Sequence, residues 1–410
     1  MNRTTRYKIR NTRHEKMTAQ DEKYMRMALK QAQRGVGRVE PNPAVGCIIT
    51  KSNQIIGRGF HKKFGEAHAE INALADCGNL GVNPRGATMY VTLEPCSHQG
   101  KTPPCTDALI AAGLGTIFVA ATDPSAHANG KGIEQLRDAG IEVHTGLCET
   151  EARLLNAPFM KFAATGWCWV ILKWAQSLDG KAALVQPGPD APDTKRQSGW
   201  ISNELSRKDV HRMRRQAQAI LVGINTVLAD NPLLTPRPSK GKRPCRVVLD
   251  SSLRIPLGSR LLRTVKTSPV LIFTSQQAAE SNPAKTERIA KKGAEWVTCP
   301  DTQGRTNLYF VLEELSRRGV TQLLVEGGPT VIASFLKERL ADEICIYISP
   351  RILGRQGRVE IAGPIAELTQ SFPLHYVETK LFGDDVCLRG LSERALRDIS
   401  IIKEPGVSPP

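Results

Sequence analysis

From about residue 20 to residue 150, apolar side chains recur at helical and at strand spacing in turn. Apolar residues keep a helical period over residues 20–34. Thr18 and Asp21, at the start of this segment, form a pair that is typical of a helix cap. Because strands alternate with helices further along, the pattern predicts a layered α/β sheet. The predicted strands are residues 47–50, 54–60 (a hairpin turning at Asn53), 87–93, 116–121 and 141–144, and the predicted helices are residues 68–75, 103–112 and 130–140.

The alternation restarts after a helical connector at residues 148–166. A chain of 410 residues exceeds what one core ordinarily supports, so we expect two α/β domains. In the second, the predicted strands are residues 169–176, 219–222, 246–249, 270–274, 322–325 and 343–348, and the predicted helices are residues 202–216, 307–318 and 331–339. The predicted organisation is a basic disordered tail at 1–19, domains at 20–155 and 156–392, and a weakly ordered tail at 393–410, with Met17 as an alternative start.

Composition and charge narrow the class of protein. No apolar run approaches the roughly eighteen residues of a membrane helix, and none follows the basic start as in a secretory signal, so we expect no membrane partner. Ten scattered cysteines favour reduced thiols in a cytoplasm over a disulfide framework. Of the net charge of +16, residues 1–16 carry +5, residues 17–155 are neutral and residues 156–410 carry +11. The first domain therefore has no electrostatic bias towards nucleic acid.

Three residues with metal-ligand chemistry lie at the ends of predicted elements of the first domain. His68 opens a helix two residues before Glu70, Cys96 follows a strand, and Cys105 opens the next helix. One imidazole and two thiolates make a zinc site that leaves a fourth position for water. Zinc turns that water into a hydroxide nucleophile, and Glu70 would carry its proton to a departing amine. We therefore predict a mononuclear zinc deaminase centre, with His68, Cys96 and Cys105 as ligands and Glu70 as the catalytic acid/base.

The prediction depends on the joint pattern, since a lone His or Cys is more often structural. His-x-Glu followed by Pro-Cys matches the signature of nucleobase deaminases, but eight residues separate the two cysteines where the signature has two. A closed structural zinc is disfavoured, because no fourth Cys or His has ligand spacing and Glu70 would then lack a purpose. His98 and His61 are weaker candidates for contact with a substrate.

Polar groups also gather at predicted strand ends of the second domain, where open α/β sheets bind ligands. The stretch Val325-Glu-Gly-Gly-Pro-Thr330 joins a strand to a helix, which suits either a phosphate or a tight turn without a ligand. Glu326 within it suits a polyhydroxylated ligand. Arg214 with Arg237 is a candidate phosphate clamp, although a basic cluster such as His211–Arg215 is usually a solvated helix face.

With these motifs the sequence resembles the family of bifunctional riboflavin-biosynthesis deaminase/reductases from about residue 20 to residue 390. The wide cysteine interval is that family's own pattern. The basic tail and the loop at residues 186–197 are departures, and neither touches a motif. The matching motifs are Pro41-Asn-Pro-x-Val-Gly46, His68-Ala-Glu70, Glu94-Pro-Cys-Ser-His-Gln-Gly-Lys-Thr-Pro-Pro-Cys105, Lys173-x-Ala-x-Ser-Leu-Asp-Gly180, Ser198-Gly-Trp-Ile201, Thr226-Val-Leu-Ala-Asp-Asn-Pro232 and Val325-Glu-Gly-Gly328.

The resemblance implies an N-terminal cytidine-deaminase-like α/β/α layer domain and a C-terminal dihydrofolate-reductase-like α/β domain. It implies deamination of a 2,5-diamino-6-ribosylamino-pyrimidinone 5′-phosphate by zinc-bound hydroxide, then reduction of the ribosyl to the ribityl chain by NADPH. It also implies a homo-oligomer, dimer or tetramer. By motif, NADPH would contact Ala175, Trp200, Thr226, Asp230, Gly328, Pro329 and Thr330, and the phosphorylated substrate would contact Asn42, Lys173, Ser198, Arg214, Leu234, Arg237 and Glu326.

A rival from another class is an RNA-binding, base-modifying deaminase with an accessory domain. The basic tail is its only support, and the neutral first domain with its long cysteine interval argues against it. A titration against RNA at two salt concentrations separates the two hypotheses, because phosphate contacts make RNA binding salt-sensitive. A further alternative, that one half is an inactive scaffold, is less well excluded for the second domain than for the first.

Overall fold

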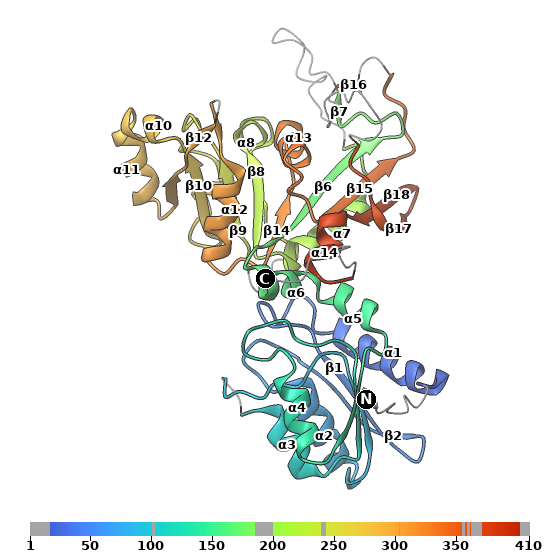
Figure 1. Ribbon diagram of the computed structural model, residues 1–410. Helices are drawn as coiled ribbons and strands as arrows, with labels where there is room; N and C mark the ends of the chain where they lie inside the picture. Colours follow the sequence, from blue (N-terminus) through green and yellow to red (C-terminus); the bar gives the residue numbers. More distant parts are fainter. Residues whose placement is uncertain are drawn as a thin grey trace, which may run out of the picture. The chain divides into compact units, whose positions relative to one another are not determined.

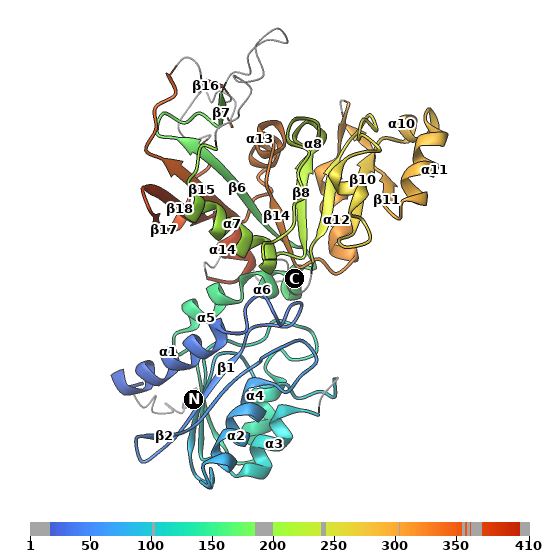
Figure 2. The same cartoon turned by 180° about the vertical axis from the view of Figure 1, so that it is seen from behind.

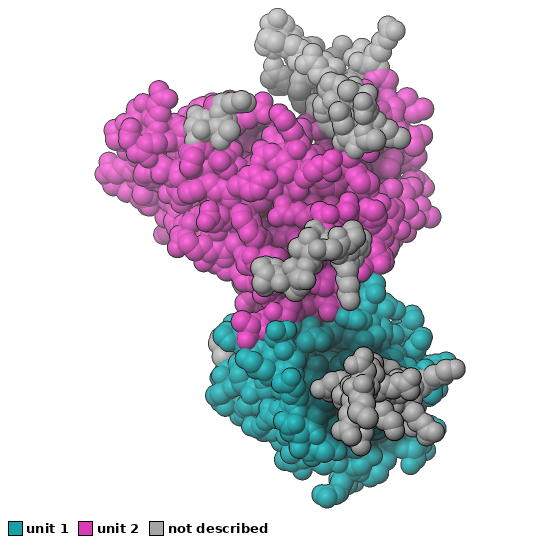
Figure 3. Space-filling view, in the orientation of Figure 1, with its two compact units in different colours: residues 1–35, 44–123, 127–152 teal, residues 36–43, 124–126, 153–410 magenta. Residues whose placement is uncertain are grey.

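The computed structural model describes residues 17–100, 103–184, 200–238, 243–302, 304–354, 357–358, 361 and 371–401. The predictions for the basic tail at 1–16 and for the loop at 186–197 fall outside these residues. The chain divides into two compact units, coloured teal and magenta in Figure 3. The first comprises residues 1–35, 44–123 and 127–152, and the second comprises residues 36–43, 124–126 and 153–410.

The first unit, which carries the labels β1 and β2 in Figure 1, is built on a mixed sheet. Its strand order is β2-β1-β3-β4-β5. β1 runs antiparallel to β2 and to β3, whereas β3, β4 and β5 are parallel. The β1–β2 hairpin turns at Ser52 and Asn53, which both have the positive φ angles that a tight hairpin turn favours. The strands are β1 Gly46–Lys51, β2 Gln54–Phe60, β3 Thr88–Val91, β4 Thr116–Val119 and β5 Glu142–Thr145.

Helices cover both faces of this sheet, as an α/β/α layer arrangement requires. On one face, buried side chains such as Ile49 and Val91 form a core with residues of α2, α3 and α4. On the other face α1 approaches β1 so closely that a Cβ added at Gly46 would lie 2.0 Å from the Ala28 carbonyl oxygen. Thr18 and Asp21 form the expected capping box of α1. The helices of this unit are α1 Ala19–Gln33, α2 Ala69–Asn79, α3 Cys105–Ala112 and α4 Lys131–Asp138. α5 Glu149–Leu155 crosses into the second unit, to which α6 Ala157–Thr165 belongs.

The second unit is built on a sheet with the order β11-β10-β9-β8-β14-β6-β15-β18-β17. Strands from β11 to β15 run parallel, and β18 and β17 close one edge as an antiparallel pair. The strands are β6 Trp169–Ser177, β8 Ala219–Gly223, β9 Cys245–Leu249, β10 Val270–Thr274, β11 Glu295–Thr298, β14 Gln322–Val325, β15 Glu343–Ser349, β17 His375–Phe382 and β18 Asp385–Leu391, with the short pairs β7 Ala183–Leu184 with β16 Gly357–Arg358 and β12 Asp301–Thr302 with β13 Arg305–Thr306.

Two ends of parallel strands lead into helices that lie side by side. β8 continues into α8 and β14 into α13, and both views place these two helices together at the same end of the sheet (Figures 1 and 2). Apolar residues of α12 and α13 pack on one face of the sheet, and α7 lies on the other. The helices are α7 Glu204–Gln216, α8 Ile224–Asp230, α9 Arg260–Arg263, α10 Gln276–Glu280, α11 Pro283–Lys291, α12 Leu308–Arg317, α13 Pro329–Lys337 and α14 Glu393–Asp398.

The predicted strands and helices are present, shifted by a few residues at most. Several elements were missed: α8 to α11, β11 and the β17–β18 pair. β17 was not predicted, because it is exposed on both faces and its sequence shows no alternation of apolar and polar residues. The weakly ordered tail predicted from residue 393 is wrong for α14, whose Ala395 and Leu396 are buried. Six residues are too few to display a helical period. In the part of the chain that the structure describes, no helix is both long and apolar enough to span a membrane.

Candidate active sites

The three predicted zinc ligands meet in the first unit. Their ligand atoms all lie within 4.8 Å of one another. The His68 Nδ1 atom lies 3.5 Å from Cys96 Sγ and 3.3 Å from Cys105 Sγ. Zinc–sulfur and zinc–nitrogen bonds at a tetrahedral angle put such atoms about 3.6 Å apart. The spacing and chemistry of these donors therefore fit a zinc ion with one open position.

Secondary structure delivers each ligand to this point. His68 is the N-cap of α2 in an extended conformation, and Cys105 is the first residue of α3, directly after Pro104. The Cys105 backbone N–H donates to Cys96 Sγ at 3.4 Å, which joins the two cysteine segments. Asn72, one turn into α2, donates to the carbonyl oxygens of Phe60 and Ala67 and so fixes the loop before His68.

Buried ionisable groups surround the triad. Glu70 is 3 % exposed, and burial raises its pKa to about 7 against the opposing attraction of the His68 imidazole. A hydrogen bond between the two thiols lowers the pKa of Cys96 and raises that of Cys105. Because a metal ion needs thiolates, a dication here would replace the shared thiol proton. The arrangement suits a metal-assisted reaction in which one buried carboxyl group moves protons.

His61 was a weak sequence candidate for substrate contact, and the structure gives it a packing role. The residue is 2 % exposed, and its ring meets the His68 ring edge-on at 5.2 Å between centroids. Its Nδ1 lies 3.2 Å from the Ala67 carbonyl oxygen. His61 therefore supports the orientation of the ligand imidazole. His98 is exposed, and its ring lies 5.7 Å from that of His127.

Glu94, next to the Pro95-Cys96 pair, was missed as a structural group. Its buried carboxylate accepts hydrogen bonds from the backbone N–H groups of Asp123, Gly130 and Gly132 at 3.2, 3.0 and 2.9 Å. Both ends of the loop at residues 123–130 are thus tied to the segment that carries Cys96. The one sequence signal for this role was the position of Glu94 in the motif, two residues before Cys96. Its hydrogen-bond partners could not be predicted, because they are distant in sequence.

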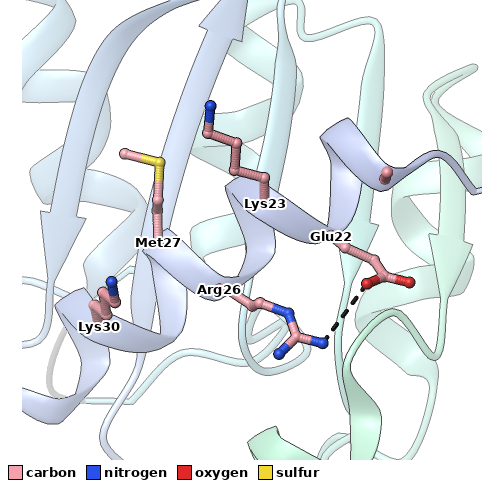
Figure 4. Close-up of a pocket in the computed structure, with 6 residues that line it drawn as sticks. Glu22, Lys23, Arg26, Met27 and Lys30 are labelled. Carbon is pink, nitrogen blue, oxygen red and sulfur yellow. Dashed lines mark ion pairs between the residues drawn. The ribbon is translucent and has the colours of Figure 1, made fainter.

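Two surface hollows contain none of the predicted site residues. One lies on the exposed face of α1, where Arg26 pairs with Glu22 at 3.6 Å (Figure 4). The other is lined by residues 255–257, 281–285 and Arg288. Both are open and are formed mainly by charged or loop residues, so neither competes with the metal triad as an active site.

A second polar cluster lies in the second unit, on the α7 face of its sheet. Arg214 on α7 donates from Nε and Nη2 to the two Glu326 carboxylate oxygens at 2.5 and 2.8 Å. Lys173 on β6 lies 3.9 Å from Glu326, and all three side chains are largely buried. Burial raises the pKa of Glu326, but the Arg214 guanidinium outweighs it and holds that pKa at about 2. The carboxylate is therefore ionised at neutral pH and faces two cations.

Most of the residues assigned to a dinucleotide lie at or after the ends of β6, β8 and β14. A Cβ added at Gly328 would lie 3.2 Å from Thr226 Oγ1, so α8 and the glycine loop meet there. The Gly327–Gly328 peptide bond is cis. Asp230 ends α8, and Pro329 and Thr330 begin α13. Ala175 lies on β6, opposite Tyr347 of β15. Trp200 is 71 % exposed, with the Arg207 guanidinium 5.3 Å from its ring centroid.

The remaining substrate candidates are spread over loops. Leu234 is buried with a φ angle of 51°, and Arg237 is exposed at the end of the same loop. Asn42 is partly buried, and its backbone N–H donates to the Val39 carbonyl oxygen at 3.0 Å. Ser198, like Lys101 of the cysteine motif, lies outside the described residues.

The sequence did not indicate several buried polar residues that support this cluster. Tyr347 donates to Asp209 of α7 at 2.7 Å, and the Lys173 ammonium lies 6.0 Å from the Tyr347 ring centroid. His211, one helical turn before Arg214, has a pKa lowered by burial and by Arg214 and Arg237. The sequence analysis had included His211 only as a member of the basic cluster at residues 211–215.

Comparisons with known proteins match each unit to a described domain. The model of the "Cytidine and deoxycytidylate deaminase zinc-binding region" matches residues 18–121, and that of the "RibD C-terminal domain" matches residues 168–388. The riboflavin biosynthesis protein RibD of Aquifex aeolicus is 40 % identical over 370 residues, which cover 90 % of this chain and 97 % of that protein.

Solved structures of RibD proteins are also similar to this chain over most of its length. RibD of Acinetobacter baumannii superposes with a TM-score of 0.77 at 34 % identity, covering 91 % of this chain and 99 % of that chain. A diaminohydroxyphosphoribosylaminopyrimidine deaminase/5-amino-6-(5-phosphoribosylamino)uracil reductase of Thermotoga maritima gives 0.75 at 35 % identity, covering 90 % and 98 %.

Fold and sites together define a bifunctional enzyme, in which a cytidine-deaminase-like zinc domain precedes a dihydrofolate-reductase-like domain. The predicted fold class is thus confirmed. The chain belongs to the RibD family of riboflavin biosynthesis proteins, which combine a deaminase and a reductase step.

Proposed function

We propose that the chain deaminates a 2,5-diamino-6-ribosylamino-pyrimidinone 5′-phosphate and then reduces the ribosyl chain of the product with NADPH. The observation that carries the first step is the triad of His68, Cys96 and Cys105 beside a buried Glu70. The second step is supported by the Lys173–Glu326–Arg214 cluster. The Thermotoga maritima relative is named for both reactions.

In the deaminase site His68, Cys96 and Cys105 would hold zinc. Bound there, zinc supplies Lewis-acid activation of water near neutral pH. Glu70 takes a proton from the attacking water and delivers it to the leaving amine, because it is buried beside the triad without being a ligand. His61 keeps the His68 ring in its orientation, and the Glu94 carboxylate holds the Cys96 segment. Asn42 remains a further candidate for contact with the phosphorylated substrate.

In the reductase site the opened aminoribose must be an acyclic imine before it accepts a hydride. NADPH would supply that hydride, and Ala175, Trp200, Thr226, Asp230 and the Gly328–Thr330 segment would hold it. Lys173 and Glu326 orient the ribose hydroxyl groups, which suits a cation and a carboxylate 3.9 Å apart. Arg214, Arg237, Leu234 and Ser198 hold the substrate, with the two arginines near its phosphate.

The second unit also has a surface suited to a second copy of the chain. Among the described strands, β17 is the last one at its edge of the sheet and pairs only with β18. Its Tyr376, Val377 and Leu381 are exposed by 50, 50 and 70 %. A homo-oligomer joined along β17 would cover this apolar edge. Light scattering of a Leu381→Glu variant tests the interface: it should lower the oligomer order, and an unchanged mass would reject β17 as the contact.

A small phosphorylated pyrimidine, rather than a nucleic acid, is the partner that we propose, in the reducing environment of a cytoplasm. None of the ten cysteines, all of which the structure describes, forms a disulfide, which suits that environment. An RNA titration at two salt concentrations checks this choice. Weak binding is expected, and tight, salt-sensitive binding would favour a base-modifying deaminase instead.

The experiment that tests the proposal supplies the purified protein with the diaminopyrimidine phosphate and follows the product by mass spectrometry, first without and then with NADPH. Without NADPH the product should be one mass unit heavier, because an amino group becomes an oxo group. With NADPH it should gain two hydrogens. A substrate that is recovered unchanged would overturn the proposal.

A further inference from the structure

Arg246 is a buried arginine in the middle of the second unit's sheet. It is the second residue of β9, which lies between β8 and β10, and it is fully buried. Among the residues that the structure describes, it forms no ion pair with a carboxylate. An arginine keeps its charge in proteins, so burial without a counter-ion costs free energy unless its N–H groups are bonded. Burial lowers the pKa of Arg246 to about 10.

Its hydrogen bonds join two separate segments. Nη2 donates to the carbonyl oxygens of Leu261 and Thr264, both at 3.1 Å, and to that of Ser268. Nη1 donates to Thr264 Oγ1 at 2.7 Å and to the Leu233 carbonyl oxygen at 3.3 Å. The acceptors at 261–268 belong to α9 and the turn after it, whereas Leu233 belongs to the loop at residues 231–237. The guanidinium therefore bridges α9 and that loop.

The loop is held from its other side by Arg214. Arg214 Nη1 lies 3.4 Å from the Thr235 carbonyl oxygen, while the rest of its guanidinium is bound to Glu326. The two arginine-bound carbonyls, of Leu233 and Thr235, flank Leu234. This residue has a left-handed φ of 51°, which a leucine rarely adopts without support. Both arginines thus stabilise one unusual backbone conformation.

We propose that Arg246 is a positioning residue for substrate binding, which acts by holding the loop at 231–237 in the conformation that presents Leu234 and Arg237 to the phosphorylated substrate. The inference rests on the proposed function, which assigns Leu234 and Arg237 to that substrate. Arg246 touches neither ligand. Its effect passes through the Leu233 carbonyl oxygen, so its loss should alter substrate affinity more than turnover or cofactor affinity.

Two variants test this role. Arg246→Lys keeps the charge but cannot bridge the same carbonyls, because an ammonium lacks the planar fork. Thr264→Val keeps the guanidinium and removes one of its acceptors, together with the hydrogen bond that Thr264 Oγ1 donates to the Arg260 carbonyl oxygen at 2.7 Å. It decides the question if Arg246→Lys fails to fold. Lys161→Met is the matched control: Lys161 is also a buried cation of this unit, but it pairs with Asp342 at 2.7 Å, away from the loop.

Steady-state reductase kinetics are measured on the full-length chain. We expect the KM for the phosphorylated substrate to rise about tenfold in Arg246→Lys and about threefold in Thr264→Val, with kcat and the KM for NADPH within twofold of wild type. Lys161→Met should lower the melting temperature without changing either KM.

Two results would overturn the positioning role. One is an unchanged KM for the substrate in the folded variants, and the other is an equal rise of both KM values with a fall in kcat, which marks general loss of structure. Arg214→Ala distinguishes failure of the proposed substrate clamp from failure of the positioning role of Arg246. If it leaves the substrate KM unchanged, the proposed clamp is wrong; if it raises that KM and the Arg246 and Thr264 variants do not, only the positioning role fails.

Discussion

The Nδ1 atom of His68 lies 3.3 Å from the Sγ atom of Cys105, although 37 positions separate the two residues in the chain. This is close to the separation of two ligands on one tetrahedral zinc ion. The Cys105→Ser variant should therefore lose zinc, because a serine hydroxyl does not replace a thiolate. Atomic absorption should show about one zinc per wild-type chain and almost none in the variant. Reductase activity should persist, and full retention of zinc would remove Cys105 from the ligand set.

Glu70 is expected to move protons without binding the metal. Glu70→Gln preserves the shape of the side chain but removes its basicity, so deamination should fall about 10²–10⁴-fold. Zinc content should stay near one per chain. Ammonia release and metal content measured on the same sample check both statements. A variant that turns over normally, or that loses its zinc, would contradict the role assigned to Glu70.

Arg214 and Arg215 offer a matched comparison on one helix. Arg214 is largely buried and bound to Glu326, whereas Arg215 is exposed. Arg214→Ala should raise the KM for the phosphorylated substrate about 10–100-fold, because a charge-assisted contact is lost. Arg215→Ala should leave the KM near wild type. Equal effects of the two substitutions would show that the helix contributes general positive charge to substrate binding, and that Arg214 does not form a specific clamp.

The Arg214–Glu326 pair should give the second unit a pH-dependent stability. The pKa of Glu326 is about 2 in the folded chain, below the ordinary value of 4.5. A depressed pKa means that the stabilisation is fully present above about pH 4.5 and is lost as the pH falls towards 2. Glu326→Gln should therefore lower the free energy of unfolding by about 3 kcal/mol at pH 7, and by less at pH 3.

Urea unfolding at the two pH values measures this difference. Glu204→Gln is the control, since Glu204 forms an exposed pair with Lys208 on α7 and should be nearly neutral at both. A loss in Glu326→Gln that is the same at pH 3 as at pH 7 would contradict the assigned pKa.

The elements that carry the zinc site were predictable because their sequence signals are local. His68 and Cys105 stand at helix starts, and Pro95-Cys96 follows an apolar strand, so the periods of the flanking segments placed all three. That they meet in space could be inferred only from their shared chemistry. The layered fold followed from the alternation of strands and helices.

The supporting groups were not predictable, because their partners are remote in sequence. Glu94 binds backbone groups 29 to 38 positions away, and Arg246 binds carbonyls on two segments that precede and follow it. A buried arginine on an interior strand contradicts the apolar pattern expected there, and only the structure shows the acceptors that make it tolerable. β17 was missed for a similar reason, since an edge strand exposed on both faces carries no periodic signal.

The central claim is that one chain carries out both a deamination and a reduction. The most direct test gives the zinc-loaded protein the diaminopyrimidine phosphate with NADPH and records ammonia release and NADPH oxidation together. The account predicts one equivalent of each per substrate, with NADPH oxidation abolished in Cys105→Ser until the deaminated intermediate is added. Ammonia release without NADPH oxidation, or oxidation in Cys105→Ser without added intermediate, would contradict it.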